Sequence, residues 1–377
     1  MNRSRAGAMI AIAAAVAIAI GLFTDPRRTG ISLLTMWAAG LGIALGASTL
    51  LMIGGVTEAR WLAPWVPVLK RVAASVVAFA VLFVPILLVA RHLYPWAGGT
   101  PLLPQDAEQI RALGGWFSVP AFVVRWVFYF GCWIVLAALL RRDGPASRAI
   151  SAVGLPVMAL TQTFAAFDGL MSLTARWYST VYGIYYFSGG LLSTLALLAI
   201  VAYRSDRGQP AQARIPSSNY RSLGLMLLTF VIFWAYIAFA QFLIIWIADV
   251  PREIIWYLPR IRGGWGSLGV VLVLGHFAIP LAVLLSARVK EQSARLAALG
   301  VWLLVMHVVD LYWLIEPSAS GGAMPHWQDL AALALVAAVT IRSAGPFPPA
   351  PGTDRSRQPS AIPPAAGAPD GMALPVR

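Results

Sequence analysis

Long runs of apolar residues, separated by short polar segments, follow one another along most of the sequence. A helix of about 20 apolar residues crosses the hydrocarbon core of a bilayer. Ten runs reach or approach that length: about 7–23, 31–54, 70–90, 118–140, 149–166, 178–203, 222–247, 266–286, 296–314 and 326–342. The pattern predicts an all-α, polytopic membrane protein with about ten transmembrane helices.

The composition agrees with this prediction. Hydrophobic residues make up 59% of the chain and charged residues 11%, with a mean hydropathy of +0.75. Soluble domains are about 45–50% apolar and about 25% charged. A soluble enzyme and a disordered chain are therefore excluded. The single cysteine, Cys132, lies inside an apolar run, which excludes disulfides and CxxC zinc sites.

The apolar runs define one membrane domain, residues 1–345, followed by a different kind of segment. Residues 346–377 are rich in proline and contain no apolar run, which predicts a disordered tail. The first run follows Arg3 and Arg5, as in a signal peptide, but no small-residue cleavage site comes after it. We therefore expect an uncleaved helix.

The net charge of +13 could indicate a nucleic-acid partner, but the distribution of the basic residues points elsewhere. Most of them lie in alternate loops, on the side of the membrane that holds the N-terminus. Basic residues are concentrated in cytoplasmic loops of membrane proteins. The charge thus predicts that both termini are cytoplasmic, and no nucleic-acid binding is expected.

Ionisable residues within the apolar runs are the candidate functional residues, because each costs about 2.5–3.5 kcal/mol on insertion scales. His276 lies near the middle of the eighth run. His307 and Asp310, three residues apart on the ninth, share a helix face, and Tyr312 follows them.

Two further charged residues lie toward the outer side. Arg125 is about two helical turns inside the fourth run, a depth similar to that of Asp310, so we expect these two residues to pair. Asp168 closes the fifth run.

The polar segment after the seventh run contains Asp249, Arg252 and Glu253 around Pro251. It is interpreted either as a loop that ends a helix or as a docking surface for an outer partner.

Three interpretations of His276, His307 and Asp310 stay open from the residues alone. In the first, His307 or Asp310 exchanges the proton of a quinol hydroxyl. In the second, His276 and His307 ligate a haem. In the third, an Arg–Asp pair and hydrogen-bonded histidines only hold the helices together.

Three segments, in this order, resemble the NrfD/polysulfide-reductase-type integral membrane proteins, and within them the ActF-type subunits of alternative complex III. They are residues 167–183, residues 233–257 and residues 307–317. The first contains Met171-Ser172-Leu173, as the family does, but departs from its pattern at Gly169 and at Thr174-Ala175. The resemblance covers about residues 7–342.

The resemblance implies two four-helix bundles plus two peripheral helices, in a bacterial inner membrane. It implies a non-haem subunit of a quinol:cytochrome c oxidoreductase that is not catalytic alone and binds no cofactor of its own. Quinol or menaquinol would be the substrate nearby. The partners would be a sister subunit of the same type, an iron–sulfur and molybdopterin-enzyme-like subunit, and haem c subunits.

Combined with the residues, this predicts a proton-handling pair, His307 and Asp310, with His276 as its neighbour, Arg125 as charge partner and Asp168 as exit group. A quinone-site anchor of another reductase of this type is one alternative. A secondary transporter is the other, although the sequence contains no clear inverted repeat.

Overall fold

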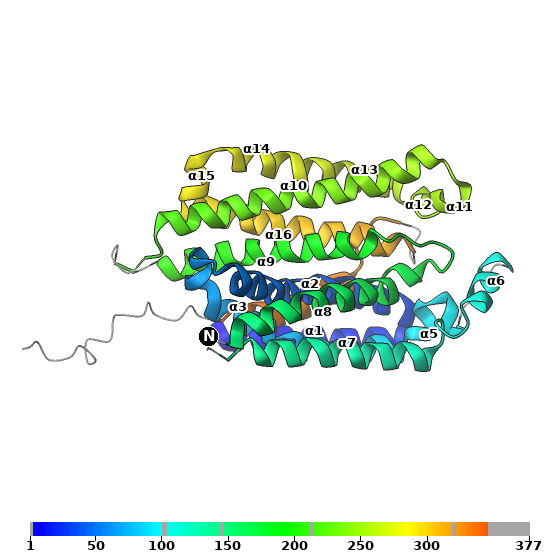
Figure 1. Ribbon diagram of the computed structural model, residues 1–377. Coiled ribbons are helices and arrows are strands. Elements are labelled where there is room, and N and C mark those ends of the chain that lie inside the picture. The colour runs from blue at the N-terminus through cyan, green and yellow to red at the C-terminus, as the bar shows by residue number, and fades with distance from the viewer. Residues whose placement is uncertain are drawn as a thin grey trace, which may run out of the picture. The chain divides into compact units, whose positions relative to one another are not determined.

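The computed structural model describes residues 3–99, 104–142, 146–207, 209–210, 214–318 and 322–345 (Figure 1). These residues form helices and no strands. Nine of their helices are long and apolar enough to cross a membrane. The predicted all-α polytopic membrane fold is confirmed. The predicted tail, residues 346–377, lies outside the described residues.

The membrane-spanning helices follow the predicted apolar runs. They are α1 (Arg3–Thr24), α2 (Pro26–Thr57), α3–α4 (Val66–Ala74 and Val76–Leu88), α7 (Val119–Leu139), α8 (Ala146–Gly169), α9 (Tyr182–Asp206), α10 (Ser217–Ala248), α13–η5–α14 (Gly263–Leu285) and α16 (Ser293–Ile315). The tenth predicted run forms α17 (Trp327–Ala344). Its 18 residues include Gln328, Asp329 and Arg342, which lower its mean hydropathy, and it is not among the nine.

Short helices connect the spans. They are η1 (Arg60–Trp65), α5 (Ala90–Leu93), η2 (Pro95–Ala97), α6 (Pro104–Ala112), η3 (Met171–Leu173), α11 (Pro251–Ile254), α12 (Leu258–Ile261), α15 (Ala287–Glu291) and η6 (Glu316–Ser318).

The spans pack as two four-helix bundles with two peripheral helices, as expected. Helices α2, α3–α4, α7 and α8 form the first bundle, and α9, α10, α13–α14 and α16 form the second. Helices α1 and α17 pack against each other and against α2, beside the first bundle (Figure 1).

Helices α2 and α9 join the bundles and are buried along nearly their whole length. Their backbones approach closely at two glycines: a Cβ on Gly190 would lie 2.7 Å from the carbonyl oxygen of Gly42. The Thr194 hydroxyl donates a hydrogen bond to the Ile43 carbonyl across the same contact, at 2.9 Å. Small residues and interhelical hydrogen bonds are the usual basis of helix packing in membranes.

The span that carries His276 is not a regular α-helix. Between α13 (Gly263–Leu272) and α14 (Ile279–Leu285) the chain forms a π segment, η5 (Val273–Ala278). The Ile279 N–H there reaches the Leu274 carbonyl, and Pro280 has no N–H to restore the α-helical pattern. Such π segments occur frequently at functional sites.

Candidate functional site

Asp310 is the centre of a buried polar cluster where three helices meet. Its side chain, on α16, is 1% exposed. It accepts a short hydrogen bond from the Tyr185 hydroxyl of α9 and one of 3.1 Å from the Trp234 indole of α10. Within the described ranges, no basic side chain forms an ion pair with it.

The two histidines complete this cluster. The rings of His276 and Trp234 lie 4.1 Å apart between centroids, and both ring nitrogens of His276 are buried without a hydrogen-bond partner among the described residues. Gly189, which has no side chain, leaves space for His307 and Asp310. A Cβ at that position would lie 3.2 Å from His307 and 3.6 Å from the Asp310 carboxylate. The structure thus brings together the three predicted residues.

The chemical character of Asp310 follows from these contacts. Transfer of a carboxylate from water to an apolar interior is costly unless a cation pairs with it. Here the Tyr185 hydroxyl and the Trp234 indole donate hydrogen bonds, and no cation pairs with the carboxylate in the described ranges. Asp310 therefore differs from a carboxylate that an arginine binds, and its proton-handling role stays a prediction.

The predicted pairing of Arg125 with Asp310 is wrong. Arg125 instead forms two hydrogen bonds with Asp168, at 2.7 and 3.0 Å. The Asp168 carboxylate also accepts from the Tyr129 hydroxyl at 2.8 Å and from the Trp116 indole at 3.0 Å. The physical reason is position around the bundle axis: α7 and α8 are neighbours in the first bundle, whereas Asp310 lies in the second.

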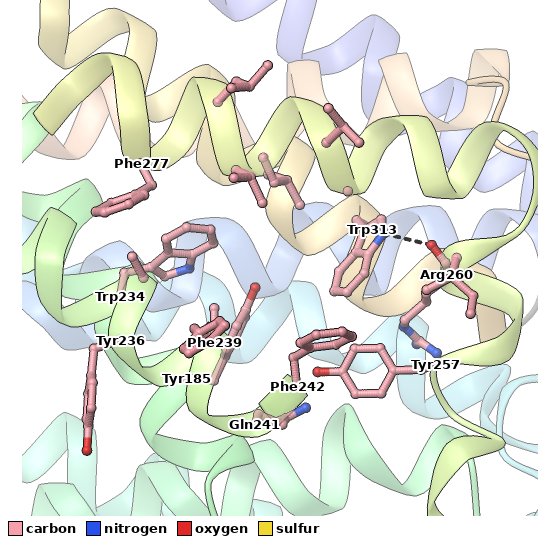
Figure 2. Close-up of a pocket in the computed structure, with 18 of the residues that line it drawn as sticks. Tyr185, Trp234, Tyr236, Phe239, Gln241, Phe242, Tyr257, Arg260, Phe277 and Trp313 are labelled. Atoms are coloured by element: carbon pink, nitrogen blue, oxygen red, sulfur yellow. Dashed lines mark hydrogen bonds between the residues drawn. The ribbon is translucent and has the colours of Figure 1, made fainter. Parts of the chain in front are cut away.

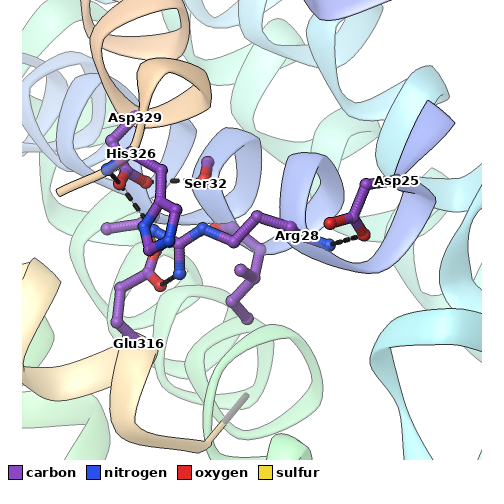
Figure 3. A network of polar contacts seen from close by, with 8 residues as sticks. Asp25, Arg28, Ser32, Glu316, His326 and Asp329 are labelled. Carbon is purple, nitrogen blue, oxygen red and sulfur yellow. Dashed lines mark hydrogen bonds and ion pairs between the residues drawn. The ribbon is translucent and has the colours of Figure 1, made fainter. Parts of the chain in front are cut away.

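A third polar cluster connects α2 with the end of the membrane domain (Figure 3). Arg28 forms ion pairs with Glu316 at 2.6 Å and with Asp329 at 2.5 Å. Ser32 donates to the other oxygen of Asp329. Tyr312, predicted as part of the Asp310 cluster, lies beside this Arg28 network. The network was not predicted because its members are 288 and 301 positions apart, so they looked like separate loop charges.

The predicted docking segment is accessible. Asp249 ends α10 with a left-handed backbone (φ 48°), and its N–H bonds to the Ile245 carbonyl. Arg252 is exposed, 5.8 Å from the ring centroid of Tyr178, and Glu253 is half-buried on α11. These contacts describe a helix end with exposed charges, and docking stays a prediction.

A large apolar groove lies beside the Asp310 cluster, between α10 and α13–η5 (Figure 2). Its volume is about 860 Å³. Tyr185 and Trp234, the two donors to Asp310, form part of its wall. Phe239 and Val273 on its edges are 59% and 60% exposed, so the groove opens sideways, toward the lipid that would surround the spans.

Neither His276 nor His307 is among the residues that line this groove, and the Trp234 ring covers His276. The haem interpretation of His276 and His307 stays a prediction.

Arg260, on α12, lies at the end of the groove and was not singled out by the sequence. It is 1% exposed, and its guanidinium carbon lies 3.6 Å from the ring centroid of Trp256. It donates to the carbonyls of Trp256 and Leu314, both at 2.6 Å, and to the Ser318 hydroxyl at 3.2 Å. Burial lowers its pKa to about 9, so it is a cation at pH 7. In the sequence, the adjacent aromatic residues Trp256 and Tyr257 are the feature that could have pointed to Arg260 as a site residue.

The fold and the site define an all-helical, polytopic membrane protein with a buried carboxyl cluster beside a groove that opens sideways. No family model matches the chain, and no curated protein matches it. The resemblance to the NrfD/polysulfide-reductase-type proteins stays a prediction.

Proposed function

We propose that this chain is a non-haem integral membrane subunit of a quinol:cytochrome c oxidoreductase of the alternative complex III type. It would lie in a bacterial inner membrane with both termini in the cytoplasm. The observation that supports this role best is Asp310, a buried carboxyl group with two donors and no ion-pair partner in the described part of the chain.

In this proposal, Asp310 takes up and releases a proton for the complex. Quinol oxidation releases protons, and a positioned carboxyl group can accept them as a general base. Tyr185 lies between the groove and Asp310 and donates to the carboxylate. Its hydroxyl passes its own proton to Asp310 and accepts another from the groove side. His276 and His307 are the neighbouring groups that extend the path.

The remaining subunits supply the redox chemistry. We expect a sister subunit of the same type, an iron–sulfur and molybdopterin-enzyme-like subunit, and haem c subunits. The exposed segment with Asp249, Arg252 and Glu253 is the proposed contact for the outer subunits.

Purification of the complex through a tag on this chain tests its partners. Mass spectrometry is expected to identify haem c and iron–sulfur subunits in the same complex. An iron–sulfur reductase without haem c would instead favour the anchor of another reductase of this type. Purification of the chain without redox subunits would contradict the proposal.

The role of Asp310 is tested in the assembled complex with Asp310→Asn. We expect at least about a tenfold loss of quinol oxidation and of the coupled proton release, the lower end of what general acid–base groups contribute. The matched control is Asp206→Asn, because Asp206 is also a buried aspartate that accepts from a tyrosine hydroxyl, at 2.7 Å from Tyr220. Unchanged rates in an assembled Asp310→Asn complex would contradict this role.

A secondary transporter is the second candidate, and the π segment η5 is the observation that favours it, since transporters bind substrates at interrupted helices. Substrate uptake by the chain alone in liposomes would support this candidate.

A further inference from the structure

The groove has the shape of a site for a chain-bearing ligand that enters from the membrane. Its volume of about 860 Å³ lies within the range of small-molecule sites. The side chains on both edges are apolar and exposed, Phe239 and Ile232 on α10 and Val270 and Val273 opposite them. An acyl or prenyl chain could therefore lie along the groove without crossing a polar barrier.

One end of the groove carries the positive charge of Arg260. Among the described residues its guanidinium donates to neutral acceptors, two backbone carbonyls and the Ser318 hydroxyl. Its Nε is buried and has no hydrogen-bond partner in the part of the chain that the structure describes. A buried cation without an anion is costly. The geometry therefore indicates that an anionic ligand group belongs here.

The groove also contains a buried acceptor, on Gln241, in addition to the buried Nε donor of Arg260. Gln241 is 4% exposed, lines the same groove, and its Oε1 is buried without a partner among the described residues. Tyr257 lies between Gln241 and Arg260 and interacts with both (Figure 2). A ligand head group that has both a negative oxygen and a hydroxyl would satisfy the two atoms.

The position of Arg260, just before a membrane span, matches the level of a lipid head group. It precedes by three positions the span Gly263–Leu285, whose α13 forms one wall of the groove. Arginine at the end of a span lies at the level of lipid phosphates, and the groove continues from there into the apolar part of the span.

We propose that this groove binds an anionic phospholipid, with its phosphate at Arg260, a glycerol hydroxyl at Gln241 and its acyl chains between α10 and α13. A neutral quinone would also fit the aromatic walls, but it would leave the charge of Arg260 unmatched. This inference concerns binding by the chain itself, so its test requires neither quinol oxidation nor assembly of the complex.

The test measures lipid binding to the full-length chain by native mass spectrometry, with phosphatidylglycerol and phosphatidylcholine added to the delipidated protein. We expect a preference for phosphatidylglycerol that falls about tenfold in Arg260→Gln, as a charge-assisted contact is lost. Arg252→Gln is the control, since Arg252 is exposed and does not line the groove. It should keep the preference.

A second variant covers the case in which Arg260→Gln fails to fold. Val273→Trp places a large ring in the groove from its exposed edge, so the fold should persist while retention of phosphatidylglycerol falls. The proposal is overturned if Val273→Trp retains phosphatidylglycerol as well as the wild type does. It is also overturned if a folded Arg260→Gln keeps the full preference, or if the purified chain carries a quinone that phosphatidylglycerol does not displace.

Discussion

Asp168 and Asp310 are both buried aspartates, one in each four-helix bundle, and their surroundings are closely similar. Each accepts a hydrogen bond from one tyrosine hydroxyl and one tryptophan indole. They differ in one respect. Asp168 also binds Arg125 through both of its carboxylate oxygens, whereas Asp310 has no basic partner in the described ranges.

This difference indicates that the two buried aspartates have different roles. A carboxylate bound by two nitrogens of an arginine is held in one orientation by a bidentate contact. This favours a structural role for the Arg125–Asp168 pair. Asp310 has the same kinds of donor but no arginine in the described ranges. The presence or absence of the cation is thus the difference on which the proposed proton-handling role of Asp310 depends.

The largest expected effect comes from removal of the cation. Arg125→Leu leaves Asp168 buried without its partner, and we expect a loss of about 3–5 kcal/mol in the free energy of unfolding. Reversible unfolding in mixed detergent micelles measures it. The double variant Arg125→Leu/Asp168→Leu should lose less than the single one, because no charge is left uncompensated. An equal or larger loss in the double variant would show that the charge pair is not the cause.

Substitution of each aspartate by asparagine compares the two sites directly. Asp168→Asn removes the ion pair with Arg125, whose side chain is 17% exposed, so we expect a loss of about 2 kcal/mol. Asp310→Asn keeps one acceptor oxygen for the Trp234 indole, and its NH2 group can donate to the Tyr185 hydroxyl, which is also an acceptor, so its loss should stay below about 1 kcal/mol. The same unfolding measurement applies, and equal losses would remove the distinction between the sites.

Removal of one hydroxyl at each site gives a smaller contrast. Tyr185→Phe removes one of the two donors to Asp310, and we expect a loss of about 1–2 kcal/mol. Tyr129→Phe should lose about half as much, since Asp168 retains its arginine and its indole partner. Thermal unfolding of both variants in the same detergent tests this order. A reversed order would indicate that Asp310 does not depend on Tyr185.

The smallest effects concern the space around the cluster. Gly189→Ala places a Cβ 3.2 Å from His307, and we expect a loss of about 1 kcal/mol. Gly131→Ala on α7 is the matched control, because a Cβ there meets nothing within 4 Å and should stabilise the helix by about 0.5–1 kcal/mol. A shift of the two melting temperatures in the same direction would contradict close packing at His307.

The fold could be predicted because apolar length and helix formation are local properties of the chain. The same is true of His307 and Asp310, whose spacing of three residues places them on one helix face. The pairing of Arg125 was predicted wrongly because sequence gives the depth of a residue in the membrane but not its position around the bundle. The contacts of Tyr185 and Trp234 with Asp310 were not predicted for the same reason, since sequence does not show which helices face each other.

The ion pairs of Arg28 have a consequence for the order of synthesis. Arg28 lies on the second helix, while Glu316 and Asp329 follow 288 and 301 residues later. At a translation rate of about 5–20 residues per second, roughly 15 to 60 seconds pass between the synthesis of Arg28 and that of its two partners. Until then α2 carries an uncompensated cation within the nascent membrane protein. Truncation before residue 316 would therefore leave Arg28 without the two carboxylates that bind it in the full-length chain.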